Sequence, residues 1–125
     1  MKRVMMVLLT GFLLNTALAQ SEEEDYTVVL PDEAQKCVLP AAPDAIPAEA
    51  DYDQMVAAKQ QVADFQAMLQ VYRDCMKAAE DGAELTAGNR QALVASYNYS
   101  VDMEERVAER FNSAVRSYKE RTAKE

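Results

Sequence analysis

Apolar residues recur every three or four positions along two long stretches of the chain, residues 51–80 and 87–121. This spacing places them on one face of a helix. In the first stretch these residues are Met55, Ala58, Val62, Phe65, Leu69, Tyr72, Met76 and Ala79. In the second stretch the corresponding positions are Val94, Tyr97, Val101, Glu104, Ala108, Phe111, Val115 and Tyr118. Because the repeat averages about 3.5 residues, we expect both helices to pack as in a coiled coil.

The segment between the two stretches is short enough to decide how the helices meet. Asp81 and Gly82 are expected to end the first helix, since glycine is favoured just past a helix C-terminus. Thr86 is a suitable N-cap for the second helix, because its hydroxyl can accept a hydrogen bond from a free backbone N–H. A turn of about six residues leaves the helices antiparallel. The sequence therefore predicts an all-α fold built on a coiled-coil-like helical hairpin.

Further apolar residues flank both faces and are expected to widen them. They are Met68, Val71 and Cys75 in the first helix, and Leu93, Val107 and Ala114 in the second. The aromatic residues at helical spacing are interpreted as core rather than as a ligand site, namely Tyr72, Tyr97, Phe111 and Tyr118. A contact between only two helices buries little surface, so we expect the N-terminal part of the chain or a second copy to cover the rest.

Residues 1–19 have the three parts of a secretory signal peptide. Lys2 and Arg3 form the basic part, residues 4–14 are mostly apolar, and Ala17-Leu18-Ala19 is a small-x-small cleavage site. The apolar run is about half of the roughly 20 residues that a membrane-spanning helix needs, so a cleaved signal is favoured over an anchor. We expect a periplasmic or secreted chain with no transmembrane segment after the signal is removed.

The mature chain is strongly acidic. The signal holds two of the 13 basic residues and none of the 21 acidic residues, so the rest of the chain has a formal net charge of −10. Such a charge repels a phosphate backbone, and nucleic acid is therefore not an expected partner. The chain has no histidine, the commonest general base and transition-metal ligand. With no phosphate-binding loop or nucleophile motif either, we expect neither an enzyme nor a bound cofactor or metal.

Residues 20–50, which we call the leader, precede the hairpin expected at residues 51–125. The leader opens with acidic residues 22–25 and the β-prone run Tyr26-Thr27-Val28-Val29-Leu30. Prolines at positions 40, 43 and 47 then favour extended, polyproline-like backbone. The acidic run could bind calcium, but it lacks the spacing and glycine of a loop that wraps one ion. We therefore interpret it as a solvated terminus.

Cys37 and Cys75 are the only cysteines, and in an oxidising compartment such a pair is expected to form a disulfide. Cys75 lies about 36 Å along the first helix from residue 51. The chain from Cys37 to residue 51 spans about 43 Å in polyproline form, just enough to return along that helix. The sequence thus predicts an extended proline-rich strap bonded to the first helix, with an intermolecular bond as the alternative. We interpret the bond as structural, since the pair lacks Cys-x-x-Cys spacing.

Charged residues of the second helix supply further candidates for a site. Asp102, Glu105 and Glu109 share one face, but arginines lie between them and helical metal sites of this kind normally add histidine. We interpret them as a solvated face. The C-terminal end carries five basic residues that either complement the helix dipole or bind an anionic surface, namely Arg110, Arg116, Lys119, Arg121 and Lys124.

Glu104 is the one charged residue within the second apolar repeat. In an antiparallel register we expect it opposite Ala63, within a turn of Lys59 or Gln66. A flanking salt bridge is the favoured interpretation, and a polar residue that sets the helix register is the alternative.

Several segments of the chain resemble a family of small exported proteobacterial helical-hairpin proteins whose function is uncharacterised. The resemblance covers about residues 37–120. It rests on the proline-rich stretch after Cys37, on Phe65 with Tyr72-Arg73-Asp74-Cys75, on Tyr97-Asn98 with Val101-Asp102, and on Val107-Ala108, Phe111-Asn112 and Tyr118-Lys119. A capping box would place Glu or Gln where this chain has Asn89, which weakens the cap and not the fold. The resemblance implies a periplasmic location and implies no activity.

The favoured function hypothesis is a non-enzymatic periplasmic protein that acts through contacts with an envelope protein or with itself. The alternative is a peripheral protein that binds anionic lipid through its basic C-terminal helix end. An enzyme is the third and least favoured hypothesis.

If residues 1–19 are a cleaved signal peptide, the exported protein begins at Gln20, because cleavage follows the small-x-small site. Intact-mass measurement of the protein purified from its native compartment tests this prediction. A mass that still includes residues 1–19 would contradict it.

Overall fold

The computed structural model describes residues 23–124, and the predicted signal peptide lies outside this part. Three helices form over the described residues, α1 (Asp32–Gln35), α2 (Tyr52–Asp81) and α3 (Ala87–Thr122), and no strand is present among them. The predictions of an all-helical chain with two long helices are confirmed. α1 was not predicted, and its Ala34 is buried.

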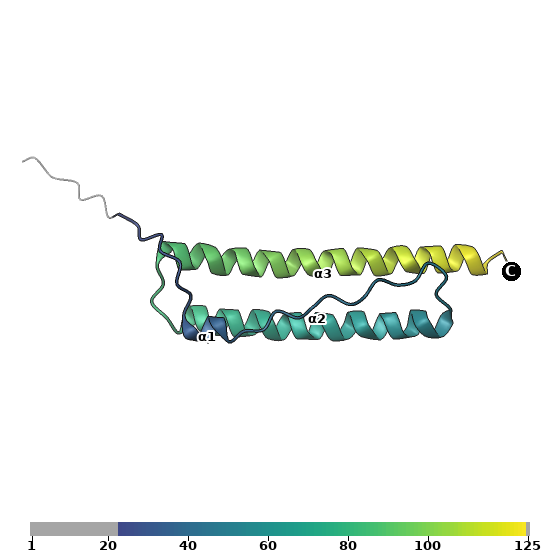
Figure 1. The fold of residues 1–125 in the computed structure, drawn as a ribbon, viewed down its shortest axis with the longest axis horizontal. Helices are drawn as coiled ribbons and strands as arrows, with labels where there is room; N and C mark the ends of the chain where they lie inside the picture. Colours follow the sequence, from purple (N-terminus) through teal and green to yellow (C-terminus); the bar gives the residue numbers. More distant parts are fainter. Residues whose placement is uncertain (1–22, 125) are drawn as a thin grey trace, which may run out of the picture.

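Helices α2 and α3 lie side by side along most of their length, and Figure 1 shows them running in opposite directions. Side-chain contacts follow the same order. Arg73, near the end of α2, hydrogen bonds to Ser100 in the first half of α3. Arg121, near the end of α3, donates to the carbonyl of Ala50, just before α2 begins. The last part of α2 therefore contacts the first half of α3, and the end of α3 lies beside the beginning of α2.

Side-chain caps define the beginning of both long helices. Asp51 forms a complete capping box with Gln54: the Gln54 N–H donates to Asp51 Oδ1 at 2.8 Å, and the Asp51 N–H donates to Gln54 Oε1 at 2.9 Å. Thr86 Oγ1 accepts the Asn89 N–H at 3.0 Å, which confirms the predicted N-cap of α3. Each cap satisfies N–H groups that have no partner inside the helix.

The buried face of α2 is the one that the apolar repeat predicted. Seven of its eight predicted residues are buried, and the eighth, Val62, is partly buried against the core. Met68 and Val71 do not widen this face, since they are 49% and 70% exposed. The spacing of apolar residues in α2 therefore predicted its buried face at the correct positions.

The buried face of α3 is centred one position from the predicted repeat, on two residues that were expected only to widen the face, Leu93 and Val107. Leu93, Ser100 and Val107 are buried, whereas Val94 and Tyr97 are 56% and 49% exposed. The prediction counted only apolar residues and so passed over Ser100, which is fully buried. Its hydroxyl accepts from Arg73 and donates to the Tyr97 carbonyl, so burial costs it no hydrogen bond. A small side chain at this position also lets the two helices approach closely.

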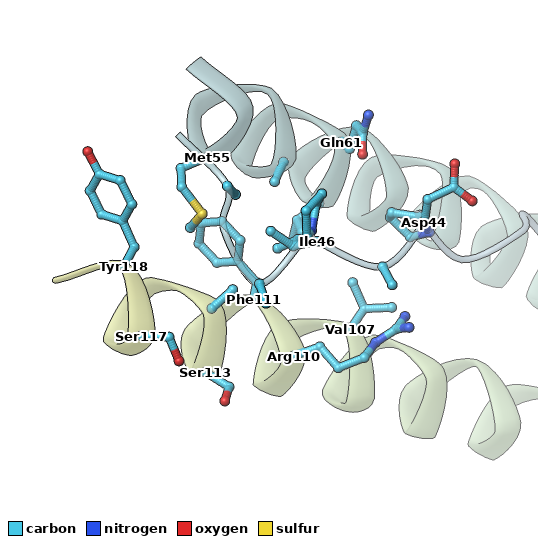
Figure 2. A pocket seen from close by; sticks show the side chains of 18 of the residues that line it. Asp44, Ile46, Met55, Gln61, Val107, Arg110, Phe111, Ser113, Ser117 and Tyr118 are labelled. Carbon is cyan, nitrogen blue, oxygen red and sulfur yellow. The ribbon is translucent and has the colours of Figure 1, made fainter. Parts of the chain in front are cut away.

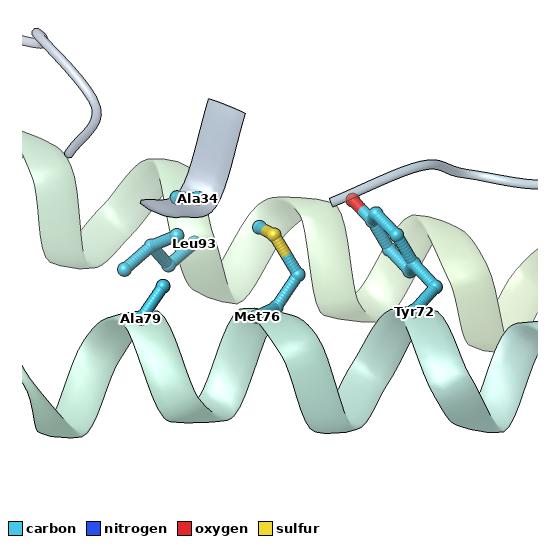
Figure 3. Packing of buried hydrophobic residues seen from close by; sticks show 5 residues of the cluster. All are labelled: Ala34, Tyr72, Met76, Ala79 and Leu93. Atoms are coloured by element: carbon cyan, nitrogen blue, oxygen red, sulfur yellow. The ribbon is translucent and has the colours of Figure 1, made fainter. Parts of the chain in front are cut away.

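The core consists of two clusters along the helix pair. One contains Ala34, Tyr72, Met76, Ala79 and Leu93 (Figure 3). The other contains Phe65, Leu69 and Val107. Leu39 of the leader contacts both clusters. The leader therefore supplies part of the core rather than only preceding the two long helices.

The leader is attached at both ends of the helix pair and follows it in Figure 1. A disulfide joins Cys37 to Cys75 of α2, which confirms the predicted bond. Near α2's first residue, Arg121 donates to the carbonyls of Ala48 and Ala50. The run Tyr26–Leu30, which composition marked as β-prone, lies against the beginning of α3 without forming a strand.

Replacing both cysteines by serine is expected to lower the free energy of unfolding by about 3–4 kcal/mol, because the bond closes a long loop in the unfolded chain. Urea unfolding followed by circular dichroism measures this change, with the reduced wild-type protein as control. A double variant as stable as the oxidised protein would contradict the prediction.

Candidate functional site

A groove lies between the leader, the first half of α2 and the last half of α3 (Figure 2), with a volume of about 330 Å³. Its floor is apolar and includes Met55, Val107 and Phe111. Its polar lining residues include Gln61 and Arg110. This size lies at the lower end of the range for small-molecule sites. We call it the leader groove.

Small side chains and prolines produce the leader groove. Pro43 and Pro47 fix the backbone φ angle and keep this part of the leader from closing onto the helices as a further helix. Ala58 and Ala114 face the space from the two helices and fill little of it. The groove therefore stays open because the side chains that line it are too short to fill it.

Arg121 closes one end of the leader groove. Its guanidinium donates to the Ala48 carbonyl at 2.5 Å and to the Ala50 carbonyl, and lies 3.7 Å from a carboxylate oxygen of Glu49. It also lies 5.7 Å from the ring centroid of Tyr118. Arg121 was predicted as part of a basic C-terminal end, but here it holds the leader instead of facing a partner.

A second groove of about 310 Å³ lies between α2 and α3, and no described leader residue lines it. We call it the open groove. Its apolar lining comes from Met76, Leu93, Val94 and Tyr97. Its polar lining comes from Gln70, Arg73, Asp74, Lys77 and Glu80. Val94 and Tyr97, which the sequence placed in the core, thus line the open groove and are about half exposed.

Arg73 organises the open groove. Its guanidinium donates from Nε to Ser100 Oγ at 2.9 Å and from Nη2 to the Ser100 carbonyl at 3.1 Å. It forms an ion pair with Glu104 at 2.6 Å and lies 5.8 Å from the ring centroid of Tyr97. The side chain is only 12% exposed. Sequence reasoning assigned Arg73 no role, because a single charged residue beside the apolar repeat does not indicate which residues of the other helix it will bond to.

The salt-bridge interpretation of Glu104 is confirmed, but its predicted partners were wrong. Glu104 pairs with Arg73 and not with Lys59 or Gln66. The prediction aligned the helices from the length of the turn alone. The structure instead aligns them by the bonds between Arg73 and buried Ser100, which place Glu104 closer to the C-terminal end of α2.

The other acidic candidates of α3 are exposed. Asp102, Glu105 and Glu109 line a shallow surface with Arg106. Glu109 forms an ion pair with Arg116 at 3.0 Å. Within residues 23–124, no group of three or more cysteine, aspartate or glutamate residues is arranged to hold a metal ion. The aromatic predictions are mixed: Tyr72 is buried, Phe111 and Tyr118 are partly buried, and Tyr97 is exposed.

Comparison with known proteins assigns no relative to this chain. A scan of protein-family models gives no match, and searches of curated proteins and of solved structures also give none. Among the described residues, no helix combines the length and the apolar character needed to cross a membrane. The family resemblance therefore stays a hypothesis, and any assignment of function depends on the two grooves and the surface around them.

Replacing Glu104 by leucine is expected to lower the free energy of unfolding by about 1–3 kcal/mol, because Arg73 then keeps little access to water and loses a charged partner. Chemical unfolding of Glu104→Leu, Arg73→Met and the double variant measures the coupling between the two side chains. Lys77→Met is a matched control, since Lys77 and Asp81 form an exposed pair expected to contribute less than about 1 kcal/mol. A Glu104→Leu protein that is more stable than wild type would contradict the prediction.

Proposed function

We propose that this chain is a non-enzymatic, exported protein that acts by binding another protein through the open groove. One observation carries the proposal. Val94 and Tyr97 are about half exposed beside a groove that no described leader residue covers. The leader groove on the same helix pair, by contrast, is lined in part by leader residues.

The lining of the open groove has the composition of a protein-binding surface. Tyrosine and arginine are enriched at the centres of protein interfaces, where tyrosine supplies a large contact area with few rotatable bonds and arginine supplies several hydrogen-bond donors. Tyr97 and Arg73 supply these groups here, and charged residues of both signs surround them. Because Ser100 and Glu104 already hold Arg73, a partner would not have to order its side chain on binding.

We propose that the protein presents this groove on a stiff frame, an antiparallel coiled-coil-like hairpin held by a proline-rich strap. The direction of the contacts between α2 and α3 supports this architecture. The disulfide, the Leu39 contacts and the bonds of Arg121 support the role of the strap. Such a frame keeps the spacing between α2 and α3 constant.

The proposed location is the periplasm or the extracellular space. A Cys37–Cys75 disulfide is the kind of bond that persists in oxidising compartments and is rare in the cytosol. The signal-peptide pattern of residues 1–19 supports the same location.

The lipid-binding alternative relies on the basic end of α3. Two of its five cations are engaged within the protein, since Arg116 pairs with Glu109 and Arg121 holds the leader. The arrangement of charges therefore favours protein contacts over a lipid surface. Flotation with vesicles of neutral lipid alone and with added anionic lipid separates the two functions: we expect no flotation with either.

A photoreactive amino acid at position 97 is expected to crosslink the protein to one defined partner in its native compartment, because Tyr97 borders the open groove. Denaturing gels and mass spectrometry measure the adduct. The same amino acid at position 105, an exposed site that lines a different surface, is the matched control and should give no adduct.

Two further results decide whether the adduct forms through binding at the open groove. Excess wild-type protein should compete it away, whereas a Val94→Glu protein of unchanged thermal stability should not. Equal crosslinking from both positions would contradict the proposal, as would flotation only with anionic vesicles.

A further inference from the structure

One edge of the run Tyr26–Leu30 faces the first turn of α3, and its backbone groups form hydrogen bonds there. The carbonyl of Asp25 accepts the Gly88 N–H at 3.1 Å, and the carbonyl of Thr27 accepts the Thr86 hydroxyl at 2.6 Å. Both backbone groups of Val29 bond to Asn89. Backbone groups of Asp25, Thr27 and Val29 thus bond to the first turn of α3, as alternate residues of an extended strand do, and the Tyr26 carbonyl also lies against Gly88 there.

Asn89 takes the place of a neighbouring strand. Its Oδ1 accepts the Val29 N–H at 2.9 Å, and its Nδ2 donates to the Val29 carbonyl at 2.8 Å. Two hydrogen bonds to the same residue are the pattern that an antiparallel strand makes with the residue directly opposite. Asn89 is buried, so the bonds are shielded from water. The departure from a capping box at this position therefore has a structural purpose.

Gly88 allows the leader to approach this closely. A Cβ atom built on Gly88 would lie 2.3 Å from the Tyr26 oxygen and 2.8 Å from the Thr27 oxygen. Both are backbone atoms, so the leader would have to move to admit an alanine. The second glycine available for comparison, Gly82, would place its Cβ 3.3 Å from the Ala78 oxygen.

The other edge of this run has hydrogen-bonding groups without a partner among residues 23–124. They are the N–H and carbonyl of Val28 and the N–H of Leu30. The side chains of Tyr26, Val28 and Val29 are 57%, 57% and 69% exposed. An extended edge with exposed β-prone side chains is a template for pairing with a further strand. Because α3 already holds the run extended, pairing requires little additional ordering.

Acidic residues flank the run on both sides. Glu23, Glu24 and Asp25 precede it, and Asp32 and Glu33 follow it. Hydrogen bonds from the Thr27 hydroxyl and N–H lower the pKa of Asp25, because they stabilise its charged form. A strand that pairs with the run therefore meets negative charge at both of its ends.

We propose that Tyr26–Leu30 is a docking edge for an extended segment of another polypeptide, apolar in its centre and basic at both ends. The segment adds as a strand along the outward edge, with Val28 as its central hydrogen-bonded position. A second copy of this chain is a poor occupant. Antiparallel pairing of two runs about Val28 would bring the acidic residues 23–25 of each copy toward Asp32 and Glu33 at the start of the other copy's α1, and like charges in proximity are destabilising. This edge is distinct from the open groove and does not depend on the function proposed for that groove.

Titration of the mature protein with a capped nine-residue peptide tests the proposal by amide NMR. The peptide alternates threonine and valine in its centre and has two lysines at each end. We expect the amide resonances of Val28 and Leu30 to move and that of Val29 to stay, since its N–H already bonds to Asn89. A matched peptide with glutamates in place of the lysines should bind at least tenfold more weakly. Shifts confined to other residues, or equal binding of both peptides, would overturn the proposal.

Protein variants check that backbone pairing carries the binding. Val28→Pro removes the outward N–H and should weaken binding at least tenfold, whereas Val28→Ala keeps the N–H and should weaken it less. Gly88→Ala displaces the run and should also abolish binding, with Gly82→Ala as its matched control. A lysine peptide that binds Val28→Pro and Gly88→Ala as tightly as wild type would overturn the proposal. Self-association of the free protein that the peptide reverses would show a second copy on this edge and would also overturn it.

Discussion

The attachment of the leader to α2 is the constraint on which the rest of the structure depends. Two helices alone leave much of their apolar surface in contact with water. The Cys37–Cys75 bond holds the leader where Leu39 can contact both core clusters, and Arg121 holds its other end beside α2's beginning. The same attachment divides the surface into a face that the leader occupies and a face with the open groove. This one covalent link thus helps to determine which apolar residues of the helix pair remain exposed.

A second interaction, between Arg73 and Ser100, sets how α3 faces α2. A charged group that loses most of its contact with water needs partners, and Ser100 and Glu104 provide them. Satisfying Arg73 turns Ser100 into the core and leaves Tyr97 at the rim of the open groove. The register of the helices and the chemistry of the candidate site therefore have one cause. The leader's first segment is positioned in a similar way, because the Asn89 side chain bonds to Val29 and Gly88 leaves room for the leader backbone in the capped first turn of α3.

Sequence reasoning predicted the helix bounds, the buried face of α2, the N-cap at Thr86 and the disulfide. These features depend on local rules, namely apolar periodicity, capping and the number of cysteines. It placed the buried face of α3 one position away, because a search for apolar residues does not identify a buried serine. Aligning the helices from the length of the turn alone gave Glu104 the wrong partner. Of the candidate site, it named Tyr97 and Val94 but put them in the core, and it gave Arg73 no role.

The sequence by itself determined that the chain forms two long helices and that its two cysteines can meet. Each of these follows from residues close together in the chain or from the reach of a segment of known length. Only the tertiary structure decided which face of α3 is buried, which groove no described leader residue lines and which hydrogen-bonding groups of Tyr26–Leu30 lack a partner within residues 23–124. Those outcomes depend on pairs such as Arg73 with Ser100 and Val29 with Asn89, whose members are far apart in the chain. No local pattern specifies such pairs, because the free energy that selects them arises only when both partners lose water together.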